Sequence, residues 1–277
     1  MGTASKISRF FVYVMTPLLV VCGTAIAANV DDLYQAQTVV TGQREETRGR
    51  GLAQCLTDVL VKVSGDARLI DDPRVATLGA QASAFAREFG YRDSMSGIPI
   101  HDEQGTRDRP YELTVNFYPD KIDAALRLLG REPWTASRPR VVVFVGVRNV
   151  RATYLLASDG IRGPGMPESL ASVAGRVGMP MALPTQAALA KAGLSFEKFP
   201  AANLADLDAA AKTIGGDLAL VGNMVWSDEA LGWIADWRLV VEGKTYEWRI
   251  RGVNFDGAFR SALRGAAQIL SGNGQPN

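Results

Sequence analysis

An uninterrupted apolar run from Val141 to Val145 constrains the fold of this chain more than any other feature. A half-buried strand alternates apolar and polar side chains, whereas a strand that is covered on both faces does not. The strand expected over Arg140–Val147 is therefore central in its sheet, with both faces covered by other parts of the chain.

The rest of the second half predicts helices followed by a strand meander. Helices are expected over Pro167–Val177, Thr185–Ala192 and Leu204–Ile214, and a short strand over Met179–Leu183. Three strands, Asp217–Trp226, Trp233–Val241 and Thr245–Val253, have short connections, which predicts antiparallel pairing. A helix over Phe255–Leu270 is expected to close this unit.

The first half predicts helices on one sheet. A helix over Glu45–Ser64 has a single apolar stripe, and Gly65 is expected to end it. A second helix is expected to begin at Pro73 and to carry apolar side chains on one side as far as Phe89. The polar segment from Tyr91 to Asp108 predicts a weak strand and a mobile turn.

Two further elements complete the first half. Alternating side chains over Tyr111–Tyr118 predict a strand, and the mature chain is expected to begin with another, over Leu33–Thr41. Asp120 is expected to cap a short helix after the second of these strands.

A boundary between two units is expected from Gly130 to Pro139, where glycine, two prolines and charged residues concentrate. The fold class predicted is α+β or mixed α/β, with two small helix-on-sheet units, the second ending in an antiparallel meander and a closing helix. The expected ranges are 1–27 for a signal peptide, 28–130 and 138–272 for the two units, and 273–277 for a disordered tail.

The first 28 residues have the layout of a secretory signal peptide. Lys6 and Arg9 precede the apolar stretch Phe10–Val21, and Ala25 and Ala27 provide small residues before the expected cleavage point. An uncleaved anchor and a lipoprotein modified at Cys22 are the two alternatives. The leader predicts a periplasmic location in a Gram-negative bacterium, with no membrane span after signal cleavage.

Charge and cysteine content exclude several classes of protein. The chain has 30 basic and 29 acidic side chains, and removal of the leader with Lys6 and Arg9 leaves a nearly neutral protein. This balance argues against nucleic-acid binding and against electrostatic docking to anionic lipid. Cys55 is then the only cysteine, so no internal disulfide is possible, and its helical position predicts a buried structural thiol.

Motifs spread over most of the mature chain resemble the bacterial envelope family called domain of unknown function 2066. They are listed here from the first unit to the second: Leu33-Tyr34-Gln35-Ala36, Val59 to Asp66, Trp134, Arg138 to Val143, Gly178 to Pro184 and the aromatic meander. The second unit also resembles the small α/β module of periplasmic assembly lipoproteins, which bind proteins. Neither resemblance implies an enzymatic activity.

Candidate catalytic groups are few. His101 is the only histidine, which excludes a histidine-rich metal site, and no Gly-x-Ser-x-Gly pentapeptide occurs. Gly160 to Gly165 lacks the Lys-Ser/Thr ending of a phosphate-binding loop. Three carboxylate pairs in predicted turns could serve a glycosidase if two of them met across a cleft, namely Asp71-Asp72, Asp102-Glu103 and Asp228-Glu229. We expect no catalytic residue, no cofactor and no metal.

Four tryptophans of the meander are the most distinctive feature: Trp226, Trp233, Trp237 and Trp248. Strand alternation places Trp233 and Trp237 on one face, away from Asp236 and Arg238. They either pack beneath the helices, which is the simpler interpretation, or form an aromatic surface for a partner.

These observations predict a non-enzymatic periplasmic protein that binds another envelope component. The expected partner is an envelope protein or a peptidoglycan-associated component. An envelope hydrolase with paired carboxylates, acting on glycan or peptide, and a carrier of a small apolar ligand between the two units are the alternatives.

Overall fold

The computed structural model describes residues 33–97 and 108–276, so the leader, His101 and the Asp102-Glu103 pair lie outside the described residues. In the first unit the chain forms β1 (Gln35–Thr41), α2 (Glu45–Ser64), η1 (Ala67–Asp71), α3 (Pro73–Gly79), η2 (Ala82–Ala84), β2 (Ala86–Asp93), β3 (Pro110–Phe117) and α4 (Pro119–Leu128). The three strands form an antiparallel sheet in the order β1-β3-β2.

The long helix α2 has the bounds that its apolar spacing predicts. Its stripe, which includes Cys55, Leu56 and Val59, is fully buried against the sheet. Gly65 follows in the left-handed region at φ 75°, a conformation that glycine adopts without a steric penalty, and its N–H caps the helix on the carbonyl of Val61.

Two expectations for the first unit are wrong. The second helix ends at Gly79 and does not reach Phe89, because the chain turns through η2 and then pairs with β3 as β2. The helical spacing of apolar residues there was coincidental, since pairing with a distant strand overrides a local pattern. Asp120 is not the cap of α4: Tyr118 holds the cap position without a side-chain hydrogen bond, and Pro119 opens the helix.

The second unit contains one mixed sheet. The chain forms β4 (Val141–Arg148), β5 (Thr153–Leu155), α5 (Met166–Val177), β6 (Met181–Ala182), α6 (Gln186–Lys191), η3 (Phe199–Ala201), α7 (Leu204–Thr213), β7 (Leu218–Ser227), β8 (Gly232–Val241), β9 (Lys244–Val253) and α8 (Phe255–Leu270). The strand order is β5-β4-β7-β8-β9, with β6 also paired to β4. β4 is parallel to β6 and β7, whereas β7, β8 and β9 form the expected antiparallel meander.

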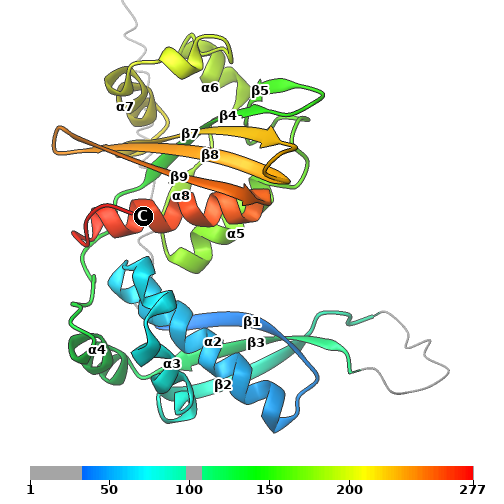
Figure 1. Cartoon of the computed structure of the whole chain (residues 1–277), viewed down its shortest axis with the longest axis vertical. Coiled ribbons are helices and arrows are strands. Elements are labelled where there is room, and N and C mark those ends of the chain that lie inside the picture. The colour runs from blue at the N-terminus through cyan, green and yellow to red at the C-terminus, as the bar shows by residue number, and fades with distance from the viewer. Residues whose placement is uncertain (1–32, 98–107, 277) are drawn as a thin grey trace, which may run out of the picture.

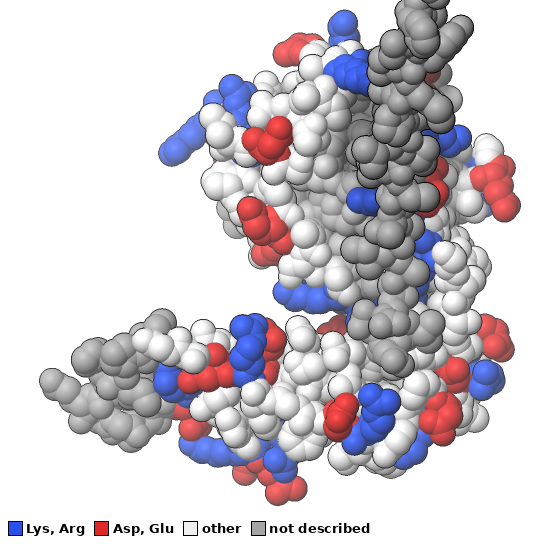
Figure 2. All heavy atoms as spheres, turned by 180° about the vertical axis from the view of Figure 1, so that it is seen from behind, with Lys and Arg blue, Asp and Glu red and all other residues white. Residues whose placement is uncertain are grey.

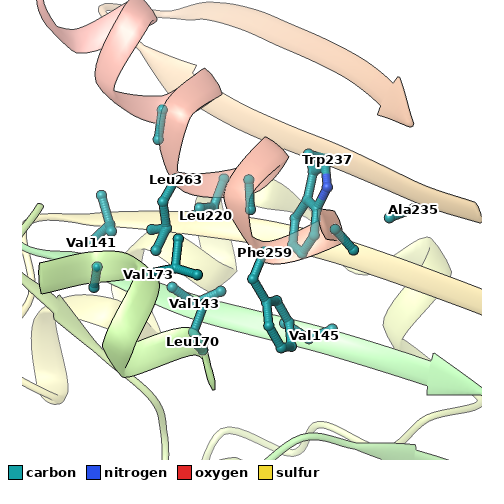
Figure 3. Packing of buried hydrophobic residues seen from close by; sticks show 14 of the residues in the cluster. Val141, Val143, Val145, Leu170, Val173, Leu220, Ala235, Trp237, Phe259 and Leu263 are labelled. Atoms are coloured by element: carbon teal, nitrogen blue, oxygen red, sulfur yellow. The ribbon is translucent and has the colours of Figure 1, made fainter. Parts of the chain in front are cut away.

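Helices cover both faces of this sheet, as the apolar run in β4 predicts (Figure 1). Val143 and Val145 face α5 and α8, whereas Val142 and Phe144 face the side of α6 and α7, and all four are buried. Figure 3 shows Val143 beside Leu170 of α5, with Phe259 of α8 in the same layer. The fold class is α+β, as expected, and the short strand β5 is an element that the sequence did not predict.

Three of the four meander tryptophans belong to this core. Trp237 is completely buried, and Trp233 and Trp248 are buried beneath α8. The backbone approaches these rings closely, because a methyl group added at Gly222 would overlap the ring of Trp237. These three tryptophans therefore do not form the aromatic partner surface that the sequence suggested as an alternative. Of the four, only Trp226 is exposed.

Candidate functional site

An open cleft of about 960 Å³ lies between the two units. Its lining comes from β1, α2 and β3 of the first unit and from α5 and α8 of the second: 35–39, Gln54, Asp58, Val61, Lys62, Glu112, 171–173, 175–177, Arg260 and Arg264. Figure 1 shows β1 as the strand of its sheet that is nearest to α5, and Figure 2 shows the hollow from behind, with basic side chains on the side of the second unit.

The wall of the first unit includes an edge of β1 that has no strand beside it in 33–97 and 108–276. The N–H of Phe117 donates to the carbonyl of Tyr34 at 2.9 Å, and the N–H of Gly42 donates to the carbonyl of Arg109 at 2.9 Å. In an antiparallel pair of strands, every second residue directs its N–H and C=O groups to the partner strand. The even-numbered residues of β1 therefore direct their backbone groups to β3. The backbone groups of Gln35, Gln37 and Val39 therefore point away from β3.

This edge is accessible, and within the described part of the chain β1 pairs with no strand other than β3. Gln37 is exposed, and the apolar side chain of Val39 is 67% exposed. The ammonium of Lys62 donates to the carbonyl of Gln35 at 2.7 Å, so one polar group of the edge already has a partner. Free strand edges are templates for pairing with another chain.

The opposite wall carries three arginines, Arg176 of α5 and Arg260 and Arg264 of α8. Arg264 lies 3.7 Å from the carboxylate of Asp58, and its Nε is buried without a hydrogen-bond partner. Burial lowers the pKa of Arg264, Asp58 opposes this effect, and the nearby Arg260 and Arg176 add to it. This wall is therefore an electropositive surface with few acidic partners.

Arg138 holds the two walls at the junction. Only 8% of it is exposed; its guanidinium donates to the carbonyl of Lys62 at 2.5 Å and to that of Val177 at 2.9 Å. It stacks 4.3 Å above the ring of Trp134. Burial lowers the pKa of Arg138 to about 10. Because one side chain binds carbonyls at the ends of both α2 and α5, it ties together two helices that supply opposite walls of the cleft.

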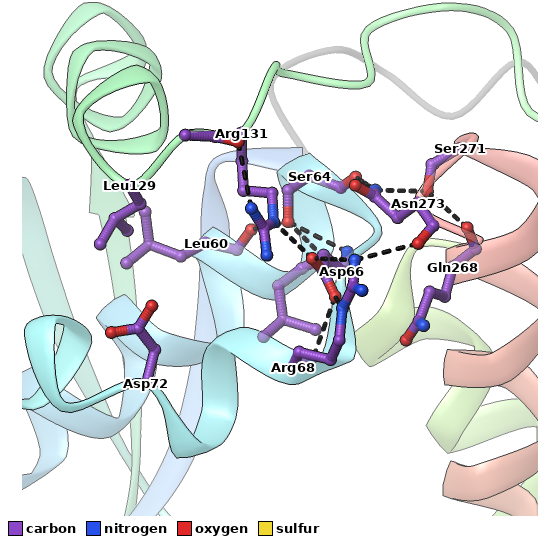
Figure 4. Close-up of polar contacts among 12 residues, drawn as sticks. Leu60, Ser64, Asp66, Arg68, Asp72, Leu129, Arg131, Gln268, Ser271 and Asn273 are labelled. Atoms are coloured by element: carbon purple, nitrogen blue, oxygen red, sulfur yellow. Dashed lines mark hydrogen bonds and ion pairs between the residues drawn. The ribbon is translucent and has the colours of Figure 1, made fainter. Parts of the chain in front are cut away.

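Asp66 organises a second contact between the units (Figure 4). Its carboxylate is fully buried and accepts hydrogen bonds from Arg68 at 2.8 Å and from Arg131 at 2.5 Å. Arg68 also donates to the carbonyl of Asn273 at 2.9 Å, and the amide of Asn273 donates to the carbonyl of Ser64 at 2.9 Å. The end of α2 is thereby tied to the segment that follows α8.

The segment after α8 makes two long-range contacts. Asn273 donates to the carbonyl of Ser64, and Gln275 donates to the carbonyl of Glu247 at 2.5 Å. Neither contact has a local sequence signal, because each joins residues that are far apart in the chain.

The described carboxylate pairs from the sequence do not meet across a cleft. Asp72 caps α3 and binds Arg74 at 2.6 Å. Asp228 accepts from the indole of exposed Trp226 at 2.8 Å, and Glu229 lies 3.9 Å from Arg251. None of these residues lines the large cleft.

The described residues include neither a metal-binding cluster nor a membrane-spanning helix. No group of three or more His, Cys, Asp or Glu side chains in 33–97 and 108–276 could hold a metal ion. Over the same residues, no helix has both the length and the apolar character needed to cross a bilayer.

Cys55 is fully buried. Burial, with a contribution from Asp58, raises the pKa of its thiol to about 12, which suits the expected structural role.

The sequence did not single out the cleft residues. Arg260 and Arg264 are four apart on a helix, so their shared face could have been noted. Their meeting with Arg176 depends on the packing of α5 against α8, which has no local signal. What the cleft offers chemically is a strand edge on one wall and cations on the other, an arrangement suited to binding.

Comparison with known proteins gives one match. Residues 27–135 match the family model of a domain of unknown function, DUF8605. This is not the domain of unknown function that the sequence resembles, so that resemblance is not confirmed. No curated protein and no solved structure matches the chain.

Proposed function

We propose that this chain is a non-enzymatic binding protein of the cell envelope that holds an extended segment of a partner protein in the cleft. The segment pairs with the free edge of β1, extending the sheet of the first unit by one strand. In such strand addition the main-chain hydrogen bonds supply affinity and the surrounding side chains supply specificity.

The single observation that carries this proposal is the outer edge of β1 at Gln37 and Val39, which lies inside a cleft and pairs with no other strand among the described residues. The five residues of β1 that line the cleft span roughly 16 Å when extended. The cleft volume is at the upper end of the roughly 300–1,000 Å³ typical of ligand sites.

The envelope location is part of the proposal. The leader with Lys6, Arg9 and Ala27 supports it, and the DUF8605 match begins next to the expected cleavage point. The likeness of the second unit to periplasmic assembly modules, which bind proteins, is consistent with a binding role. Fractionation and N-terminal sequencing of the mature protein test this part, and an intact leader on a cytoplasmic pool would contradict it.

The two alternatives have less support. A hydrolase needs two carboxylates facing each other, whereas Asp58 faces Arg264 and Glu112 binds Arg92 at 2.6 Å. A carrier of an apolar ligand needs an enclosed apolar cavity, whereas this cleft is open and lined by many polar and charged side chains.

The proposal is tested by a proline at the edge. In Val39→Pro the missing N–H is one that points away from β3, so the sheet keeps its own hydrogen bonds while the edge loses a donor. Full chains purified from the periplasm would be screened against a displayed library of random dodecapeptides. The unmodified protein should enrich defined sequences, and Val39→Pro should not.

Thr245→Pro is the matched control. Val241 and Lys244 flank a two-residue hairpin turn, so they form a hydrogen-bonded pair and Thr245 points away from β8. Thr245 is exposed on β9, an edge strand of the second sheet, and does not line the cleft. This variant should enrich the same peptides as the unmodified protein.

Two readouts complete the test. Equal melting temperatures of the variants would show that the fold is intact. The amides of Gln37 and Val39 should exchange more slowly with solvent when an enriched peptide is bound. Enrichment by Val39→Pro equal to that of the unmodified protein, or no enrichment by either, would overturn the proposal.

A further inference from the structure

We infer that the segment held beside β1 is acidic, and that Arg176, Arg260 and Arg264 bind its carboxylates. This inference rests on the proposed function and adds the chemistry of the partner. It comes from the charges that face β1 across the cleft.

Two of the three arginines have capacity for a new partner. Arg260 is exposed, and no hydrogen bond or ion pair joins it to another of the described residues. Arg176 is exposed and donates to the hydroxyl of Ser172 at 3.1 Å, which leaves the other donors of its guanidinium unoccupied within the described residues. A guanidinium binds a carboxylate most strongly through two parallel hydrogen bonds.

Arg264 has an incomplete partner set. Its side chain is 27% exposed, and its Nε is buried without a hydrogen bond. Asp58 approaches only to 3.7 Å, which is long for a charge-assisted hydrogen bond. A carboxylate in the cleft would add a partner for the exposed part of the Arg264 side chain and would reduce the repulsion between the neighbouring guanidinium groups.

The carboxylates that line the cleft do not neutralise this wall. Asp58 lies 3.7 Å from Arg264 and accepts a hydrogen bond from Gln54 at 3.3 Å, and Glu112 is engaged by Arg92 at 2.6 Å. Lys62 adds another positive charge at the floor, where it donates to Gln35. Among the residues that the structure describes, four cationic and two acidic side chains therefore line the cleft.

A peptide satisfies the cleft better than a free anion does. A small anion would occupy the arginines and leave the edge of β1 unpaired, whereas an extended acidic peptide uses both walls at once. Alternate side chains of an extended strand point to the same side, so acidic residues two apart can both reach the arginines. The near-neutral charge of the whole chain also argues against a polyanion that needs a wide basic surface.

The experiment uses the library selection above and one matched pair of variants. The enriched dodecapeptides should carry more Asp and Glu than the starting library. The most enriched peptide and its counterpart with Asn and Gln in place of Asp and Glu would then be titrated against the full chain, against Arg176→Gln/Arg260→Gln and against Arg238→Gln/Arg251→Gln. The last variant removes the same charge outside the cleft.

We expect a loss of roughly tenfold in affinity for the acidic peptide with Arg176→Gln/Arg260→Gln. The same loss should follow when the neutral peptide replaces the acidic one, and the two changes together should cost little more than either alone. Arg238→Gln/Arg251→Gln should bind the acidic peptide as the unmodified protein does.

The outcomes separate this inference from the proposed function. Enriched peptides without an acidic bias, or equal affinity of Arg176→Gln/Arg260→Gln for the acidic peptide, would overturn the inference and leave strand addition intact. If the loss from Arg176→Gln/Arg260→Gln and the loss from the neutral peptide were fully additive, the acidic residues of the peptide would bind groups other than these arginines. That result would also overturn the inference. Failure of the unmodified protein to enrich any peptide would overturn both.

Discussion

Asp66→Asn should be the most destabilising polar substitution at the junction of the two units. The carboxylate of Asp66 is fully buried and accepts from the backbone and side chain of Arg68 and from the side chain of Arg131. The amide of asparagine has the same shape but no charge, and its N–H₂ faces these donors. The substitution removes charge-assisted hydrogen bonds and leaves two cations without their shared partner.

The magnitude follows from burial and exposure. Breaking a buried ion pair from one side costs about 3–5 kcal/mol. Since the side chains of Arg68 and Arg131 are 43% and 27% exposed, water compensates part of that loss, and we expect about 3 kcal/mol, the lower end of the range. For a protein of this size, that loss corresponds to a melting temperature lower by about 6–12 °C.

The stability difference between Asp66→Asn and the unmodified protein should depend on pH. Burial disfavours the ionised carboxylate of Asp66, but the hydrogen bonds from Arg68 and Arg131 outweigh burial and hold its pKa below the usual value. Because its pKa is lower in the folded state, the ionised carboxylate of Asp66 contributes stability above the unfolded pKa of about 3.9. That contribution is lost as pH falls through the folded pKa. The difference between the two proteins should be constant from about pH 5 to 8 and should narrow below about pH 4.

Urea unfolding followed by circular dichroism at several pH values measures this difference. Asp236→Asn is the control, because Asp236 binds an arginine, Arg249, that is 67% exposed, so its removal should change stability much less. Equal unfolding of Asp66→Asn and the unmodified protein at neutral pH would refute the reasoning. A gap that stays constant below the pKa of a free carboxyl would refute the electrostatic part.

Three further predictions concern the second unit, the thiol and one turn. Gly222→Ala should lower stability by about 1–3 kcal/mol, because its methyl group overlaps the buried ring of Trp237, and calorimetry would measure the loss. Cys55 should resist a thiol reagent in the native protein and react only after unfolding, since it is fully buried and its pKa is raised to about 12; rapid native labelling would contradict this. Leu231→Asn should raise stability by about 0.5–1 kcal/mol, because Leu231 is 84% exposed at φ 50°, a region that asparagine tolerates better; an unchanged unfolding midpoint would contradict it.

The candidate site was the least predictable part of the molecule. Arg176, Arg260 and Arg264 come from two helices, and their common wall depends on how α5 and α8 pack. The free edge of β1 was equally hidden, because a strand is an edge only through the absence of a neighbour, which is a property of the whole sheet. The sequence instead drew attention to the four meander tryptophans, of which three form core.

Local pattern determined the elements whose contacts lie along one stripe or one face. Apolar side chains at helical spacing predicted α2 and α8 with the observed bounds, because a helix that buries one stripe must repeat it every turn. The run Val141–Val145 determined the central place of β4 for a similar reason, since both of its faces exclude water.

Tertiary structure alone decided the rest. Pairing with β3 made β2 a strand where the spacing indicated a helix, because backbone hydrogen bonds between distant segments outweigh a weak local preference. Arg138 and Asp66 became junction residues only when the ends of α2, α5 and α8 came together. A cleft is a space between elements, so its shape and charge depend on long-range packing that neighbouring residues in the chain do not encode.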